Sequence, residues 1–268
     1  MNTKAKIYTA LSLLVSTYSF SQAGPGGVTT DNEIWLKAEN SSYIDAGTSL
    51  GTDNSLIQQW NDVSGNGNNA LQSNGSYQPK LKTNAINGYS ALNFDGDNDR
   101  ILATGIGQNG QVSLFVVLQA TSFDSNTRGI IQAGPSGTAF SDQINDKSIG
   151  MWATNGNIWG RGIESDGTVH SFSKTGGIKL LGNTSYIITQ DYNGTDIIQS
   201  VNATVSETLG YDGTLKDFSD FGIGKQSATS FKGDIAEVIL YTRALNLAET
   251  TIVENYLSAK YGTALDAS

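Results

Sequence analysis

Clustered carboxylates are the residues of this sequence that could most directly do chemistry. In "FDGDNDR" (94–100), Asp95, Asp97 and Asp99 stand at alternate positions, as they do where a calcium-binding EF-hand loop begins. That loop needs Gly at its sixth position and Glu at its twelfth, where this chain has Arg100 and Ile106. The segment is therefore not an EF-hand, and it predicts either an acidic turn between strands or a different oxygen cage for a structural Ca²⁺.

Paired carboxylates would indicate a glycosidase, since hydrolysis of a sugar bond needs two of them facing each other across the bond. On one strand they would stand at alternate positions, as in E-x-D-x-x-E or E-x-D-x-E, and no such run occurs. His170 is the only histidine, the chain has no cysteine, and no G-x-S-x-G elbow is present. "GIGQNG" (105–110) matches a dinucleotide motif in its letters, but a strand pattern follows it where a helix is required. We therefore expect no catalytic residues and no nucleotide.

Aromatic residues around a tight turn form the second candidate site. Trp152 and Trp159 flank an Asn-Gly turn, with Asn157 and Arg161 close by and Tyr192 on a later strand. Exposed aromatic faces that stack on sugar rings, with polar groups reaching the hydroxyls, make a carbohydrate platform. The alternative is that these strand aromatics pack against the other sheet of a sandwich.

Short strands joined by turns must position these residues, because the chain has 31 glycines and only 15% charged residues. Asn-Gly supplies the positive φ of a type I′ turn, so "TNGN" and "YNGT" each predict a hairpin. The predicted strands are apolar or alternating runs bounded by turn residues: 33–38, 90–94, 112–120, 128–133, 148–154, 157–163, 185–192, 195–201 and 233–241.

One segment near the C-terminus has a helical period. Asn246 is a suitable N-cap with Glu249 three residues later, and Gly262 stands where a helix commonly ends. The apolar residues that the period places on one face are Leu247, Ile252, Val253, Tyr256 and Leu257. Many strands followed by one helix predict an all-β, two-sheet sandwich with a C-terminal helix.

The N-terminus indicates export. Lys4 and Lys6 precede a short apolar run and the small residues of "SQA", so residues 1–23 are predicted to be a signal peptide, with cleavage after Gln22 as the near alternative. The formal charge of −9 disfavours nucleic acid and anionic membranes as partners. Without cysteine the domain at 24–268 has no disulfides, so its stability must come from core packing, with calcium as a further contributor.

Several motifs occur together in a familiar order: "EIWLKAE", "WNDVSGNGNNALQ", "INGYSALNFDGDNDRIL" and "FKGDIAEVILYTRALNLAETTIVENYLSAKYGTAL". Together they resemble the laminin-G-like, concanavalin A-like jelly-roll domains of secreted bacterial surface proteins. The resemblance implies that Asp62 and Ser64 hold a turn by hydrogen bonds to the backbone, with a cation at Asp62 as the alternative. It also implies that Glu237 faces a neighbouring strand or the terminal helix and is not catalytic.

Together, the sequence patterns and the resemblance predict a secreted, non-catalytic recognition module at the cell surface. We expect it to bind a glycan or another cell-surface ligand through Trp152, Asn157, Trp159, Arg161 and Tyr192, in a role such as adhesion. Calcium, if bound, is expected at Asp62, Asp95, Asp97 and Asp99. The alternatives are a structural spacer of a larger adhesin, or a glycoside hydrolase or lyase with paired carboxylates in a groove.

Overall fold

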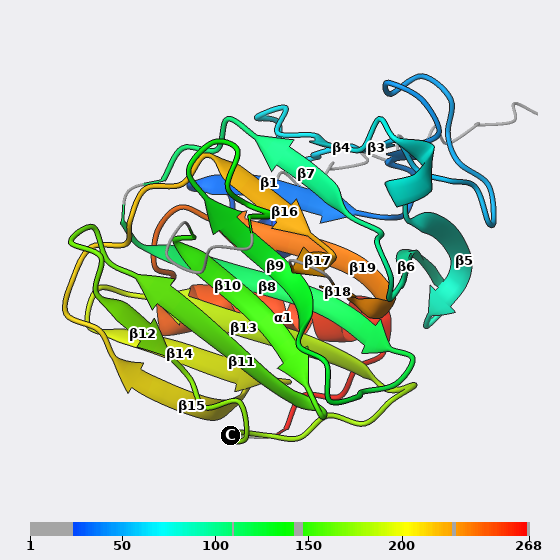
Figure 1. The fold of residues 1–268 in the computed structure, drawn as a ribbon. Helices are drawn as coiled ribbons and strands as arrows, with labels where there is room; N and C mark the ends of the chain where they lie inside the picture. Colours follow the sequence, from blue (N-terminus) through cyan, green and yellow to red (C-terminus); the bar gives the residue numbers. More distant parts are fainter. Residues whose placement is uncertain (1–23, 109, 142–146, 227–228, 267–268) are drawn as a thin grey trace, which may run out of the picture.

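Two antiparallel β-sheets pack face to face, and one α-helix lies on the outer side of the first sheet (Figure 1). The computed structural model describes residues 24–108, 110–141, 147–226 and 229–266. The predicted signal peptide at 1–23 lies outside the described residues. The two sheets and the helix confirm the predicted all-β sandwich with a C-terminal helix.

The first sheet, here called sheet A, has the strand order β15-β14-β13-β8-β19-β6-β5, and β1 pairs with β19. Its strands are β1 (Asn32–Lys37), β5 (Lys80–Ile86), β6 (Tyr89–Asp95), β8 (Val112–Ala120), β13 (Ser185–Tyr192), β14 (Asp196–Val201), β15 (Thr204–Gly210) and β19 (Lys232–Tyr241).

The second sheet, sheet B, has the order β12-β11-β10-β9-β16-β7-β4-β3-β2, with β17 and β18 beside β9. Its strands are β2 (Ser42–Tyr43), β3 (Gln59–Trp60), β4 (Ala70–Leu71), β7 (Ile101–Thr104), β9 (Arg128–Gly134), β10 (Ile149–Thr154), β11 (Asn157–Ile163), β12 (Val169–Ser171), β16 (Asp220–Ile223), β17 (Lys225–Gln226) and β18 (Thr229–Ser230). Two 3₁₀ turns, η1 (Pro25–Gly27) and η2 (Gly75–Tyr77), lie in connections.

Strand β8 is buried on both faces, which explains its continuous apolar run "VSLFVVL". Leu114 and Val116 belong to the core between the sheets. Phe115 and Val117 belong to a second core, which sheet A forms with helix α1 (Leu247–Tyr261). Successive side chains of a strand point to opposite faces, so one strand contributes to both cores.

Helix α1 begins and ends as the sequence predicts. The Asn246 side chain accepts a hydrogen bond from the Glu249 backbone N–H, the Glu249 side chain accepts one from the Asn246 N–H, and Gly262 follows in the left-handed conformation with φ 62°. The predicted apolar face is only partly right. Val253 and Leu257 are buried against sheet A, whereas Leu247 is 83% and Ile252 44% exposed.

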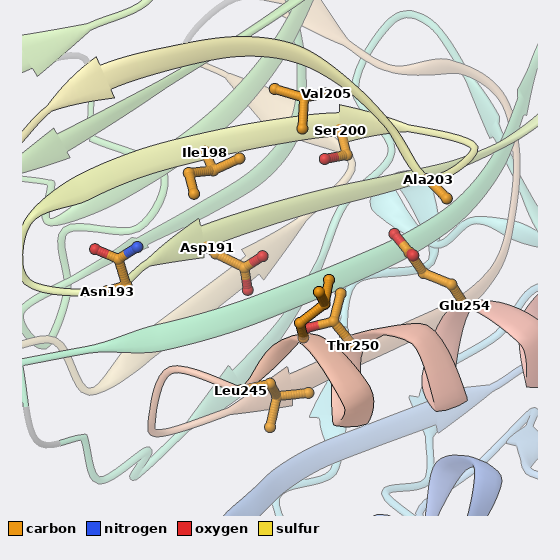
Figure 2. A pocket seen from close by; sticks show the side chains of 10 residues that line it. Asp191, Asn193, Ile198, Ser200, Ala203, Val205, Leu245, Thr250 and Glu254 are labelled. Carbon is orange, nitrogen blue, oxygen red and sulfur yellow. The ribbon is translucent and has the colours of Figure 1, made fainter. Parts of the chain in front are cut away.

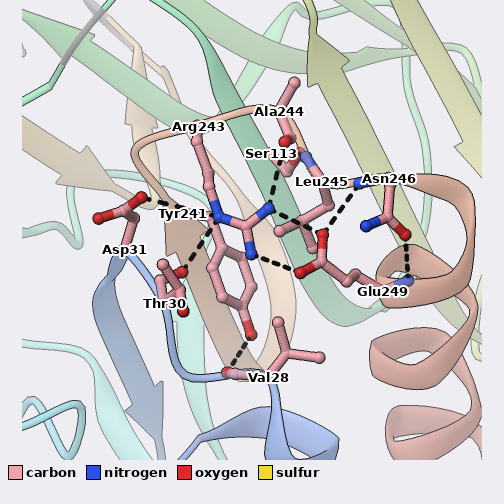
Figure 3. A network of polar contacts seen from close by, with 10 residues as sticks. All are labelled: Val28, Thr30, Asp31, Ser113, Tyr241, Arg243, Ala244, Leu245, Asn246 and Glu249. Carbon is pink, nitrogen blue, oxygen red and sulfur yellow. Dashed lines mark hydrogen bonds and ion pairs between the residues drawn. The ribbon is translucent and has the colours of Figure 1, made fainter.

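An arginine network ties the start of this helix to the N-terminal segment (Figure 3). Arg243 donates to both oxygens of Glu249 at 2.8 and 2.7 Å and to the Thr30 carbonyl at 3.3 Å. The Tyr241 hydroxyl donates to the Val28 carbonyl at 3.0 Å. The N-terminal segment, the end of β19 and the first helical turn are thus joined into one polar cluster.

All nine predicted strands are present, and no bound differs from the predicted one by more than one residue. In the β10–β11 hairpin, Asn155 (φ 52°) and Gly156 (φ 87°) form the predicted two-residue turn. The β13–β14 connection is longer than the predicted type I′ turn, because the Asn193 side chain accepts from the backbone N–H groups of Thr195 and Asp196. An Asx turn therefore replaces it.

No helix within the described ranges has the length and apolar character needed to cross a membrane.

Candidate functional site

The predicted aromatic platform lies on the face of sheet B that points away from sheet A. Gly160 and Gly162 of β11 point toward β13, since a side chain added there would meet Gln190 and Tyr192. The alternating positions of β11, including Trp159, therefore face outward, and Trp152 is its cross-strand partner on β10.

The indole rings are nevertheless buried, which corrects the expected exposed platform. Trp152 is 1% and Trp159 3% exposed, and the rings stack with their centroids 4.5 Å apart. The Trp152 ring lies directly over Gly150, where a Cβ would come within 2.0 Å of it. Because a glycine leaves this space free, the ring lies flat on its own sheet and presents no open face to a sugar.

The other three predicted contact residues hold the structure around this pair. The fully buried Tyr192 hydroxyl donates to the Arg161 carbonyl at 2.9 Å from the core side of the sandwich. The Arg161 guanidinium donates to Ser171 at 2.7 Å and lies 5.8 Å from the Trp152 ring centre. Asn157 pairs with Thr154 at the end of the hairpin. The five residues are neighbours, as predicted, but they expose no aromatic surface.

The four aspartates predicted to hold calcium do not form one cluster. In the described part of the chain, no group of three or more acidic or histidine side chains is arranged to hold a metal ion. Asp95 accepts from the backbone N–H of Asp97 at 2.8 Å, and Asp99 accepts from that of Asp95 at 3.0 Å. These hydrogen bonds within the segment are those of an acidic turn between strands, which was the first alternative. Burial raises the pKa of Asp99 to about 6, and the neighbouring Asp95 and Asp97 charges add to this effect.

Asp62 has the structural role that the resemblance implies. Its Oδ1 accepts from the backbone N–H groups of Trp35 and Ser64, both at 2.9 Å. Its Oδ2 accepts from the Ser64 hydroxyl at 2.7 Å and from the Asn68 N–H at 3.1 Å. Four donors thus fasten the loop to β1. Calcium binding stays a prediction, which the melting temperature with calcium and with a chelator would test.

An open groove lies on the helix side of sheet A and is here called the aromatic groove. It has a volume of about 620 Å³ and is lined by Trp35, Lys37, Glu39, Tyr89, Tyr256, Ala259 and Lys260. The Trp35 and Tyr256 rings meet edge to face with their centroids 6.1 Å apart. The Lys37 ammonium lies 4.8 Å from the Trp35 ring centre. The groove therefore combines ring surfaces with both signs of charge.

A buried carboxylate beneath this groove holds two of its aromatic side chains in place by hydrogen bonds. Glu237 on β19 is fully buried and accepts four hydrogen bonds. The Trp35 indole donates to Oε1 at 2.6 Å and the Tyr256 hydroxyl at 2.9 Å, while the Lys260 ammonium and the Tyr261 hydroxyl donate to Oε2 at 2.7 Å each. Burial first, and then the Glu237 charge, raise the pKa of both tyrosines. Glu237 thus faces the terminal helix, as the resemblance implies.

A second, smaller cavity of about 250 Å³ lies between α1 and the outer face of β13, β14 and β15 (Figure 2). We call it the acidic pocket. Its carboxyl groups are Asp191 and Glu254, and Asn193, Ser200 and Thr250 are its neutral polar residues. The rest of its wall is aliphatic, formed by Ile198, Ala203, Val205, Leu245 and Leu247. Burial raises the pKa of Asp191 to about 6 and that of Glu254 to about 7.

The sequence patterns predict neither the aromatic groove nor the acidic pocket. Trp35, Tyr89 and Tyr256 are far apart in the sequence and come together through the pairing of β1 and β6 with β19 and the packing of α1. Asp191 and Glu254 likewise come from a strand and the helix. One sequence feature could have indicated the acidic pocket. Glu254 places a charged side chain in the apolar face of the predicted helix, between Val253 and Leu257.

Comparison with solved structures finds the same sandwich in larger proteins. The receptor-binding domain of botulinum neurotoxin D matches with a TM-score of 0.57 and 14% identity over 84% of this chain and 52% of that chain. The serotype D ligand-binding domain in complex with N-acetylneuraminic acid matches with 0.56 and 14%, over 84% and 50%. Trypanosoma rangeli sialidase with the inhibitor DANA matches with 0.54 and 17%, over 86% and 33%.

At these identities the likeness shows the fold. The chain spans about half the length of the toxin domains and a third of the sialidase. No family model matches the chain, and no curated protein matches it. The resemblance to laminin-G-like domains therefore continues to rest on the sequence motifs.

Proposed function

We propose that this chain is a non-catalytic glycan-binding module and that the aromatic groove receives the sugar. The observation that carries the proposal is the lining of the groove. Tyr89 and Tyr256 are half-buried and offer ring surface, Lys37 and Glu39 offer a charge of each sign beside them, and the volume of about 620 Å³ suits a small saccharide.

The positions of the groups favour a sugar that carries a carboxylate. The Lys260 ammonium is held by Glu237 at 2.7 Å, whereas the partly exposed Lys37 lies with its ammonium over the Trp35 ring. An ammonium beside ring surface can pair with a sugar carboxylate while the ring packs on its C–H face. Structural neighbours that carry N-acetylneuraminic acid or a sialidase inhibitor support this choice of first ligand.

In this proposal the module acts outside the cell, in adhesion or recognition, after removal of residues 1–23. Catalysis is not part of it. The acidic pocket has two carboxyl groups, but its described lining is aliphatic or neutral polar and offers no aromatic ring on which a sugar could stack.

A glycan array followed by titration with N-acetylneuraminic acid tests the proposal. Lys37→Ala and Tyr89→Leu should each weaken binding about tenfold, because each removes one of the two recognition elements. Lys174→Ala is the matched control, since Lys174 also lies 4.8 Å from a tryptophan ring centre, at Trp159 on sheet B. Loss of binding in the Lys174 variant, with the groove variants unaffected, would move the site to sheet B. A blank array would favour the spacer alternative.

A further inference from the structure

The acidic pocket has the features of a binding site that the proposed glycan function does not use. Asp191 on β13 and Glu254 on α1 line the same cavity, and Figure 2 shows both carboxyl groups directed into the space between strand and helix. Glu254 is 6% exposed, so its carboxyl is largely removed from water. Asp191 is partly exposed as a residue, but its Oδ1 is enclosed. Among the described residues no cation is paired with either acid, and burial of a charge has a large cost unless it is paired.

The described neighbours of these carboxyl groups are neutral or acidic. Thr189 donates to Glu254 at 3.0 Å, and Ser113 hydrogen-bonds to Asp191. Oδ1 of Asp191 is enclosed and has no hydrogen-bond partner among the residues that the structure describes. Among the residues that the structure describes, no lysine or arginine lines the pocket, and none contributes to the pKa shift of either acid. The site therefore has acceptors in place and lacks a cationic donor.

The rest of the wall indicates what should carry that cation. Leu245 and Ile198 line the pocket with the acids, and the strongly exposed Leu247 (83%) and Val205 (58%) form most of its solvent-facing rim, beside the partly exposed Asn193 and Thr250. An apolar rim around an acidic interior fits a cation on a short hydrocarbon chain, whose chain covers the rim while its head reaches the acids. A volume of about 250 Å³ lies just below the usual range of ligand pockets, so the ligand should be small.

We propose that the acidic pocket binds a primary alkylammonium group, with Asp191 and Glu254 as its acceptors and Leu245, Leu247 and Val205 around its chain. The group can belong to a free amine or to a lysine side chain of a peptide. This site is independent of the aromatic groove, so either can fail in experiment without affecting the other.

Titration of the full chain, followed by NMR or calorimetry at pH 8, tests this proposal with three ligands of one shape. Butylammonium should bind, whereas n-butanol and butyrate should bind about tenfold more weakly or not at all, since they lack the cation. Nα-acetyl-lysine methylamide distinguishes the two sources: binding as tight as that of butylammonium supports a lysine side chain, and absence of binding restricts the site to free amines. Equal binding of butanol and butylammonium would overturn the proposal.

Isosteric variants locate the site. Glu254→Gln and Asp191→Asn should each weaken butylammonium binding about tenfold. Asp166→Asn is the matched control, because it removes one acidic charge from an exposed loop of the other sheet and keeps the acceptor for the Thr168 N–H. Neither pocket variant should lower the melting temperature at pH 8, because each removes a buried charge that lacks a cation. Binding that survives in both pocket variants would refute the assignment.

The pH dependence provides an independent check. The titratable groups that face each other here are Asp191 from β13 and Glu254 from α1, with the neutral Ser113 and Thr189 beside them. Both acids become protonated as the pH falls from 8 to 5, because burial raises their pKa values to about 6 and about 7. Butylammonium affinity should therefore fall about tenfold or more across this range, and a constant affinity would contradict the assignment.

Discussion

Glu237 should be the most sensitive single position on the helix side of the sandwich. Its two carboxylate oxygens accept from Trp35 and Tyr256 on one side and from Lys260 and Tyr261 on the other. In Glu237→Gln, one of these oxygens is replaced by an NH₂ group, which cannot accept a hydrogen bond. The shape is conserved, so the change tests the hydrogen bonding and the charge.

Neither orientation of the new amide satisfies every donor. If the amide oxygen faces Lys260, the NH₂ group meets the Trp35 indole N–H; if the amide is turned, the NH₂ group meets the Lys260 ammonium. Tyrosine hydroxyls can rotate and accept, but the indole and the ammonium can only donate. Lys260 also loses its buried counter-charge, since its side chain is 11% exposed and that of Glu237 is fully buried.

Removal of one partner of a buried ion pair costs about 3–5 kcal/mol. A loss of that size lowers the melting temperature by about 6–20 °C in a chain of this length. Urea denaturation followed by tryptophan fluorescence measures the free energy of unfolding. Glu39→Gln, at the half-buried glutamate of the same groove, is the matched control and should change it by less than about 0.5 kcal/mol.

Tyr261→Phe removes one of the four donors and should cost about 1.5–3 kcal/mol, less than Glu237→Gln. A loss below about 1 kcal/mol for Glu237→Gln would refute the reasoning, because it would mean that the carboxylate does not fasten the helix to sheet A.

Substitutions at the buried tryptophan pair, at Asp62 and at Glu249 test three other sets of contacts. Trp152→Ala or Trp159→Ala should lower the free energy of unfolding by about 3–5 kcal/mol in urea denaturation, because both rings are buried; an exposed platform would lose less than about 0.5 kcal/mol. Asp62→Ala should cost about 2–3 kcal/mol, since four donors lose their acceptor, and an unchanged melting temperature would show that the loop is held otherwise. Hydrogen bonds from Arg243, and then from the Asn246 backbone, lower the pKa of Glu249 from 4.5 to about 2, so its stabilisation is present above about pH 4.5 and is lost as the pH falls through 2. Thermal melts between pH 2 and 5 should accordingly show a smaller acid-induced loss for Glu249→Gln than for the unchanged chain.

Local rules account for the elements that the sequence predicted well. Asn246, Glu249 and Gly262 act through hydrogen bonds and backbone conformation within a few residues of themselves, so the helix ends could be read directly. Asn155 and Gly156 specify their hairpin in the same way. The strands that were missed are short or exposed. β3 and β4 have two residues each, and β15 has no buried residue, so their apolar patterns are weak and their pairing depends on a partner strand.

The positions of the functional groups depend on side-chain packing and sheet order, which the apolar pattern of a strand does not contain. Alternation along β11 shows which side chains share a face with Trp159, but not that Gly150 leaves room for the Trp152 ring to lie on the sheet. The aromatic groove exists because β1 and β6 both pair with the same strand, β19, which depends on sheet order.

The same division holds for the chemistry of the acids. Asp62 holds its turn largely through neighbours close in the sequence, and this role could be anticipated from the motif around it. Asp191 and Glu254 gain raised pKa values only when helix and sheet together remove them from water, because desolvation is a property of the packed chain and not of any short segment. The local sequence thus determined the turns, the helix caps and the positions of the longer strands, whereas long-range packing of helix and sheet created the aromatic groove and the acidic pocket.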